Sequence, residues 1–131
     1  MNRHHTFYFV TLIAISAVAL VFHLLIFLQV IPYEITWGGR LKSLQEMYVF
    51  ETISILINTF FVYVLLQKGQ FVKRLFSEKA LTIILWVFFT IFSLNTIGNI
   101  FAQTSFEKWF ALVTLANAIL IWLINKNQQT S

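Results

Sequence analysis

Several side chains able to do chemistry lie inside stretches that are otherwise apolar, and Glu51 is the most distinctive of them. Glu51, Ser54 and Asn58 are spaced three and four residues apart, which places them on one face of a helix. A carboxyl group in such a stretch is expected to be protonated or paired, and His23 or Arg40 is the expected partner. With His23 as that partner, the two groups have the chemistry to exchange a proton as acid and base.

Asparagine side chains extend this polar set. Asn95 and Asn99 share a helix face, and Asn117 lies in the last apolar stretch. At a rise of about 1.5 Å per residue, His23 lies about 12 Å deep and Asn58 near the middle of the bilayer. The opposite halves of the stretches are almost wholly apolar, so we expect a polar cavity that opens on one side only. Asparagine between membrane helices also serves as a packing contact worth about 0.6 kcal/mol on average, and this alternative stays open.

Four long apolar stretches must position these side chains. Of the 131 residues, 59% are hydrophobic and only 11% are charged, whereas a soluble domain has about 25% charged residues. About 20 apolar residues in a helix cross a bilayer, and lipid excludes open backbone structures. We therefore predict an all-α integral membrane protein, a four-transmembrane-helix up-down-up-down bundle, in one membrane domain. The expected spans are residues 6–31, 46–67, 79–103 and 106–124.

The ends of these stretches carry residues that start or stop helices. Pro32 disfavours helical geometry in the residue before it, which predicts the end of the first span. Glu78 is expected to favour the start of the third span through its charge. Two pairs match the capping box, in which each side chain accepts a hydrogen bond from the other residue's amide: Ser43 with Glu46, and Thr104 with Glu107.

Basic residues are distributed unequally about the spans, which predicts the orientation. Six lie on the side of the two termini, and three lie on the side of the first loop. The six are Arg3, Lys68, Lys73, Arg74, Lys79 and Lys126; the three are Arg40, Lys42 and Lys108. By the positive-inside rule both termini are cytoplasmic, and the loop over residues 32–45 faces outward. The expected location is the cell (plasma) membrane, as a multi-pass protein.

The first loop has an unusual composition. It holds the only proline and two of the four glycines, together with the candidate binding residues Tyr33, Glu34, Trp37 and Arg40. Gly38 and Gly39 permit positive φ and a tight reversal, which would fold these side chains over the mouth of the bundle as a lid. The alternative is an interfacial loop in which Glu34 and Arg40 form a surface ion pair of little energetic value.

The loop and the start of the second span carry a resemblance. Pro32-Tyr33-Glu34-x-x-Trp37-Gly38-Gly39-Arg40, followed by Glu46-Met47-Tyr48-Val49-Phe50-Glu51, resembles a group of small, uncharacterised four-helix bacterial membrane proteins. The likeness covers about a sixth of the chain, and it implies a bacterial inner membrane but no known activity. In architecture the chain is also similar to the sterol-isomerase and sigma-2-type four-helix proteins, but their pair of acidic residues is not reproduced.

Composition narrows the functional classes. Cysteine is absent and only three histidines occur, so we predict no disulfide, no metal site and no cofactor. The net charge of +4 is explained by residues that flank spans, so we predict no nucleic-acid partner. We expect the lipid bilayer as partner, a small amphiphilic or lipid-like ligand in the outward cavity, and a homo-oligomer as one possible assembly. The alternatives are a small proton-linked transporter subunit, an intramembrane enzyme using Glu51 and His23, and an accessory subunit.

Overall fold

The structure, a computed structural model, describes residues 3–128, and these form four α helices without any strand. The helices are α1 (Arg3–Phe27), α2 (Leu44–Lys68), α3 (Glu78–Ile100) and α4 (Ser105–Gln128). The connection between α1 and α2 holds two short 3-10 turns, η1 (Tyr33–Ile35) and η2 (Trp37–Gly39). The prediction of an all-α chain with four long helices is confirmed.

All four helices are long and apolar enough to cross a membrane. Only 22–33% of the most apolar window in each helix is buried inside the chain, so most of the apolar side chains face outward. Val18, Leu94 and Leu112, for example, are 70%, 63% and 61% exposed. An apolar exterior of this extent suits lipid and not water. The chain is therefore a multi-pass membrane protein.

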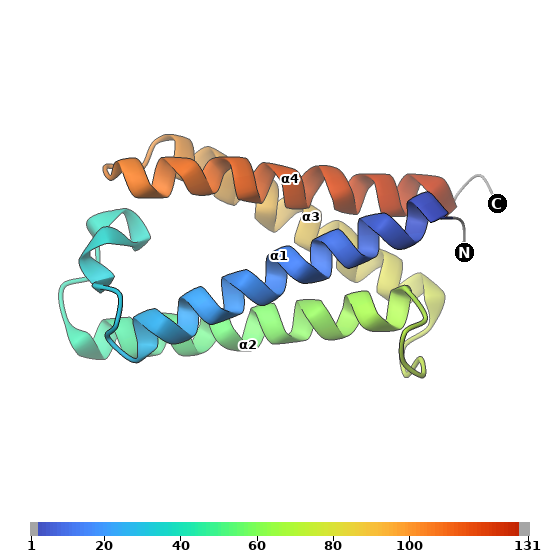
Figure 1. Cartoon of the computed structure of the whole chain (residues 1–131), viewed down its shortest axis with the longest axis horizontal. Coiled ribbons are helices and arrows are strands. Elements are labelled where there is room, and N and C mark those ends of the chain that lie inside the picture. The colour runs from blue at the N-terminus through green and yellow to red at the C-terminus, as the bar shows by residue number, and fades with distance from the viewer. Residues whose placement is uncertain (1–2, 129–131) are drawn as a thin grey trace.

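The helices pair as two hairpins that diverge toward one end (Figure 1). The pairs are α1 with α2 and α3 with α4, and consecutive helices run in opposite directions. The start of α1 and the end of α4 lie at the converging end, which we call the terminal end (Figure 1). At the opposite end, the loop end, η1 and η2 lie between the two hairpins. These two turns belong to the first loop, the segment with the unusual composition described above.

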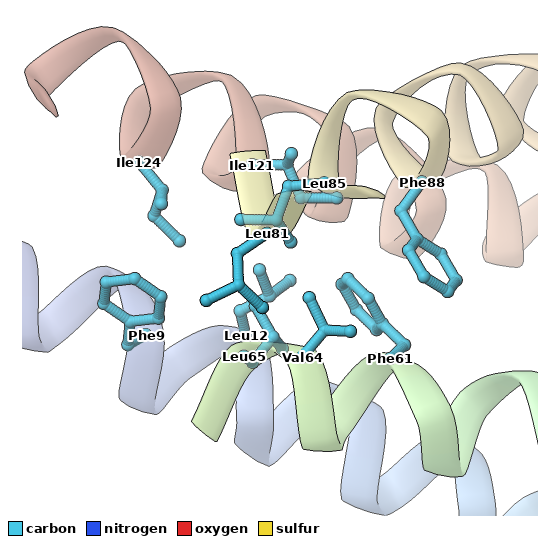
Figure 2. Close-up of a cluster of buried hydrophobic side chains, with 10 residues drawn as sticks. All are labelled: Phe9, Leu12, Phe61, Val64, Leu65, Leu81, Leu85, Phe88, Ile121 and Ile124. Carbon is cyan, nitrogen blue, oxygen red and sulfur yellow. The ribbon is translucent and has the colours of Figure 1, made fainter. Parts of the chain in front are cut away.

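An apolar core occupies the half of the bundle next to the terminal end (Figure 2). Side chains from all four helices converge there, and the rings of Phe61 and Phe88 lie 4.4 Å apart. The buried members are Phe9, Leu12, Phe61, Val64, Leu65, Leu81, Leu85, Phe88, Ile121 and Ile124. This cluster agrees with the expectation that one half of the bundle is apolar scaffold.

Helix α1 ends earlier than predicted, at Phe27 and not at residue 31. Gln29 adopts a left-handed conformation with φ of 59°. The Gln29 amide bonds to Ile26 O at 2.8 Å, and the Val30 amide bonds to Leu25 O at 2.8 Å. These two contacts make a Schellman motif, which satisfies the last carbonyl groups and turns the chain out of the helix before Pro32 is reached. The motif is hard to predict, because glycine usually occupies the left-handed position.

The other predicted spans also shift at their ends. Helix α3 stops at Ile100, so Gln103 lies in the following turn, and α4 continues to Gln128. Ser43 caps α2 by accepting from the Glu46 amide at 3.2 Å, as the capping box predicts. The reciprocal bond differs, because the Glu46 carboxylate accepts from the Lys42 amide at 2.8 Å and not from the Ser43 amide.

Helix α2 ends in a second Schellman motif with a glutamine in the left-handed position. Gln70 has φ of 61°, its amide bonds to Gln67 O at 3.1 Å, and the Phe71 amide bonds to Leu66 O at 2.9 Å. A non-glycine residue in this conformation costs about 1 kcal/mol or more per residue. The end of α2 therefore carries a local strain that a glycine would relieve.

Replacing Gln70 by glycine is expected to stabilise the protein by about 0.5–1 kcal/mol, since glycine adopts positive φ without steric cost. The measurement is the free energy of unfolding in mixed micelles, followed by circular dichroism. Gln45→Gly is the control, because the same replacement inside the first turn of α2 has the opposite sign and costs up to about 1 kcal/mol. Equal changes in the free energy of unfolding for Gln70→Gly and Gln45→Gly would contradict the assignment of a strained left-handed conformation to Gln70.

The connection between α2 and α3 is held by the side chains of Gln67 and Lys68, whose burial was not predicted from the sequence. Gln67 Oε1 accepts from the amides of Leu75 at 2.7 Å and Phe76 at 3.1 Å. Lys68, only 2% exposed, donates from Nζ to Glu78 and, at 2.6 Å, to Thr82. Arg74 Nη1 also reaches Glu78, at 2.5 Å. Glu78 thus does more than favour the start of α3, because it neutralises a buried lysine.

Candidate functional site

Glu51 is fully buried and accepts hydrogen bonds from two other elements of the fold. His23 Nδ1, on α1, lies 2.7 Å from Glu51 Oε2, and Trp37 Nε1 donates to Glu51 Oε1 at 2.8 Å. The contact with His23 is an ion pair when the imidazole is protonated, and a neutral donor's hydrogen bond when Nδ1 alone carries hydrogen. His23 is the expected partner of Glu51, whereas none of the ion pairs within residues 3–128 involves Arg40.

The lid segment, which we define as residues 33–40, reverses tightly at its glycines. Gly38 and Gly39 have φ of 70° and 67°, as expected, and Trp37 has φ of 55°. Positive φ in a tryptophan is a strained conformation, costing about 1–3 kcal/mol, that persists only where surrounding contacts impose it. The hydrogen bond to Glu51 and a ring contact with Phe50, 5.0 Å between centroids, are such contacts. The contacts with Glu51 and Phe50 therefore hold Trp37 in a strained conformation, which brings its indole N–H to the carboxylate.

A second carboxylate anchors the lid segment from the opposite hairpin. The Gly38 amide donates to Glu107 Oε1, and Glu107 is only 7% exposed. Thr104 Oγ1 lies 2.7 Å from Glu107 Oε2 and 3.3 Å from Ile35 O. The Glu107 amide also bonds to Thr104 Oγ1 at 3.3 Å, as the capping box predicts. Glu107 thus has two roles, and the sequence indicated only the cap.

Beneath the lid segment lies a cavity of about 250 Å³, which we call the main cavity. All four helices and the lid segment contribute to its wall. Its apolar lining consists of Ala19, Phe22, Ile26, Phe92, Phe106, Phe110 and Val113. Its polar lining consists of His23, Thr36, Trp37, Glu51, Asn58, Asn95, Asn99, Glu107, Thr114 and Asn117. The polar set includes seven of the ten candidate residues named from the sequence: six lie on the four helices, and Trp37 lies in the lid segment.

A residue in the wall of the main cavity has a buried amide oxygen without a hydrogen-bond donor from residues 3–128. Asn117 is 4% exposed, and its Oδ1 is buried without a partner. Asn58 donates from Nδ2 to Ser54 O at 2.9 Å, a bond that does not use its Oδ1. Thr114 differs, because its hydroxyl accepts from Thr96 at 2.9 Å and so joins α4 to α3. Thr114 is a packing contact, whereas Asn117 keeps an unused acceptor.

A second cavity of about 310 Å³ adjoins the first. Trp37, Asn95, Asn99 and Glu107 line both cavities, so these four side chains form a shared wall. Arg40 lines only the second cavity, together with residues from the end of α3 and the turn after it. The two candidate groups of opposite charge, Glu51 and Arg40, are thus assigned to different cavities.

Two candidate residues from the first loop line neither cavity. Tyr33 packs against the small apolar cluster of Ile26, Leu41 and Met47 at the loop end. Glu34 is exposed, and residues 3–128 contain no ion pair between it and Arg40. The alternative of a Glu34–Arg40 surface pair is therefore not supported, and the lid segment is held instead by Glu51 and Glu107.

The site combines ring-lined apolar walls with a few oriented polar groups. That combination is typical of pockets for small molecules, although 250 Å³ is below their usual range of about 300–1,000 Å³. A small ligand, or the polar end of a larger one, fits such a volume. No protein-family model, curated protein or solved structure matches this chain.

Proposed function

We propose that the protein binds a small amphiphilic, lipid-like molecule in the main cavity. The observation that carries this proposal is the buried Asn117 Oδ1, which has no donor and belongs to a residue of the cavity wall. Leaving a buried acceptor unpaired costs about 1–3 kcal/mol, which a bound polar group would recover. The apolar walls would hold the remainder of an amphiphile. The lid segment would separate the bound molecule from water at the loop end.

The proposed orientation places the loop end outside the cell. Six basic residues flank the terminal end and three flank the loop end, so the positive-inside rule favours cytoplasmic termini. The main cavity then belongs to the outer half of the bilayer. We extend the proposal to a bacterial plasma membrane, on the resemblance of the loop sequence.

Acid–base catalysis inside the membrane is the second candidate function. It is favoured by the Glu51–His23 distance of 2.7 Å, which meets the reach required for proton transfer. Proton-linked transport is favoured less, because the apolar core lies between the main cavity and the terminal end. Loss of a proton-linked flux in liposomes on Glu51→Gln would favour transport over binding.

Filling the main cavity tests the proposed binding function. Ala19 lines the cavity, so Ala19→Phe is expected to exclude the ligand and to reduce the amount of co-purified amphiphile roughly tenfold or more. The measurement is native mass spectrometry of protein released from nanodiscs. Ala17→Phe is the matched control, because Ala17 lies on the same helix, is exposed and does not line the cavity.

The control decides how the result is interpreted. Retention of the bound molecule by Ala17→Phe and its loss from Ala19→Phe would support the main cavity as the site. Equal retention by both variants would exclude it. The added phenyl ring can also disturb folding. The circular dichroism and thermal stability of both variants must therefore match those of the parent protein.

A further inference from the structure

The amides of Asn95 and Asn99 bring both donors and acceptors to the main cavity, whereas its carboxyl oxygens add acceptors. Within residues 3–128, Asn117 Oδ1 is buried without a donor, and Asn58 bonds to Ser54 O through its amide nitrogen and not through Oδ1. The carboxylates of Glu51 and Glu107 add four oxygens, each with one contact in the fold and a lone pair that remains. The Trp37 indole N–H is already used by Glu51. The carboxyl oxygens therefore shift the balance of the wall toward acceptors, which favours a ligand that supplies donors.

The ionisable side chains of the wall are mostly acidic, which agrees with the balance of its hydrogen bonding toward acceptors. Glu51 and Glu107 line the main cavity, and no lysine or arginine of residues 3–128 does. Within residues 3–128, His23 is the one basic side chain in this wall, whereas Arg40 shares the second cavity with Glu107. When ionised, the two carboxyl groups outnumber His23, so a cation in the main cavity would meet unlike charge.

Aromatic rings line the same cavity as the two carboxyl groups. Phe22, Phe106 and Phe110 form one cluster, with Phe22 5.7 Å from Phe106 and 5.1 Å from Phe110 between ring centroids. Phe92 and Trp37 line other parts of the wall. Ring faces attract cations within about 6 Å of their centroids. Walls of this kind lower the cost of removing a cationic head group from water.

Resting on the proposed binding function, we propose that the main cavity selects amphiphiles whose head group is a primary ammonium. Such a group has three donors and no acceptor, which matches the acceptors that the carboxyl oxygens add. A hydroxyl group has one donor and brings an acceptor of its own, so it matches less well. A carboxylate has only acceptors and would meet Glu51 and Glu107 at close range.

Three probes with the same tail test this selection. Octylamine, octan-1-ol and octanoate are titrated into the protein in phosphatidylcholine nanodiscs by calorimetry, with the Ala19→Phe protein as the blank for partition into lipid. We expect octylamine to bind roughly tenfold tighter than octan-1-ol and octanoate not to bind above the blank. Tighter binding of the alcohol or the acid would overturn the head-group proposal while leaving the binding function in place. No probe binding above the blank would overturn both.

Carboxylate variants test which residues confer the selection. Glu107→Gln keeps an oxygen for the Gly38 amide but removes the charge, and we expect it to weaken octylamine roughly tenfold while leaving octan-1-ol unchanged. Glu46→Gln is the matched control, since Glu46 is exposed and lines neither cavity. An equal loss for amine and alcohol in Glu107→Gln would assign that residue a structural role only and contradict the proposal.

A membrane offers primary ammonium groups both on free amines and on aminophospholipids, and one more experiment separates these sources. Phosphatidylethanolamine replaces part of the phosphatidylcholine in the nanodisc, and octylamine is titrated again. Competition that weakens octylamine would identify an aminophospholipid head group as an occupant. Unchanged affinity would assign the cavity to free amines. Either result is compatible with ammonium selection, whereas an increased affinity for octylamine contradicts competition for one site.

Discussion

Replacing Glu51 by alanine is expected to release the lid segment and to speed hydrogen exchange at the Gly38 amide by about ten- to a hundredfold. The carboxylate is fully buried and joins α1, α2 and the lid segment through His23 and Trp37. Alanine leaves both donors without their acceptor, at a cost of about 1–3 kcal/mol for each donor that stays buried. The cost here is toward the lower value, because Trp37 is 38% exposed.

Strain in the lid segment adds to this effect. Trp37 and both glycines have positive φ, and the tryptophan alone among them has a side chain that opposes it. Once Glu51 no longer holds the indole, Trp37 can relax to negative φ, and Gly38 then moves away from Glu107. The Gly38 amide therefore exchanges faster although neither Gly38 nor Glu107 has been changed.

Glu34→Ala is the matched control for this prediction. Glu34 belongs to the same segment, is exposed and lines neither cavity, so its removal should leave the exchange rate at Gly38 unchanged. Exchange is measured by mass spectrometry on peptides covering residues 36–40 in nanodiscs. An unchanged rate in Glu51→Ala would mean that Glu107 alone holds the lid segment, and the two-anchor description would be wrong.

Contacts that depend on position along one helix could be predicted from the sequence. The apolar stretches gave the number of helices, and the spacing of Asn95 and Asn99 gave the face that lines the cavity. The pairing of His23 with Glu51 followed because both residues lie at a similar depth next to the same loop. Depth follows from the number of residues to the helix end and face from the helical period, and neither depends on how neighbouring helices pack.

Contacts that depend on how the two hairpins meet could not be predicted. The second role of Glu107 requires the lid segment to cross from one hairpin to the other, which no local pattern specifies. Gln29 ends α1 early through a conformation that its residue type does not favour. Lys68 was interpreted as a residue flanking a span, and its burial against Glu78 depends on the turn between α2 and α3.

Replacing Glu78 by alanine is expected to destabilise the protein by about 3–5 kcal/mol, because it leaves the buried Lys68 ammonium without a counter-charge. The Lys68 side chain is fully buried, whereas that of Glu78 is 48% exposed. Thr82 would remain as a hydrogen-bond partner but carries no charge. The measurement is the free energy of unfolding in mixed micelles.

The two partners of this pair should respond unequally to removal, because their burial differs. Lys68→Met removes the buried charge and keeps an unbranched apolar side chain, so it should cost about 1 kcal/mol or less. Combining it with Glu78→Ala should recover most of the stability lost in Glu78→Ala alone. Arg74→Ala is the control, since Arg74 makes an exposed ion pair with Glu78 worth about 0–1 kcal/mol. If Glu78→Ala costs no more than Arg74→Ala, the Lys68 charge finds water or another partner, and the buried pair does not hold the α2–α3 connection.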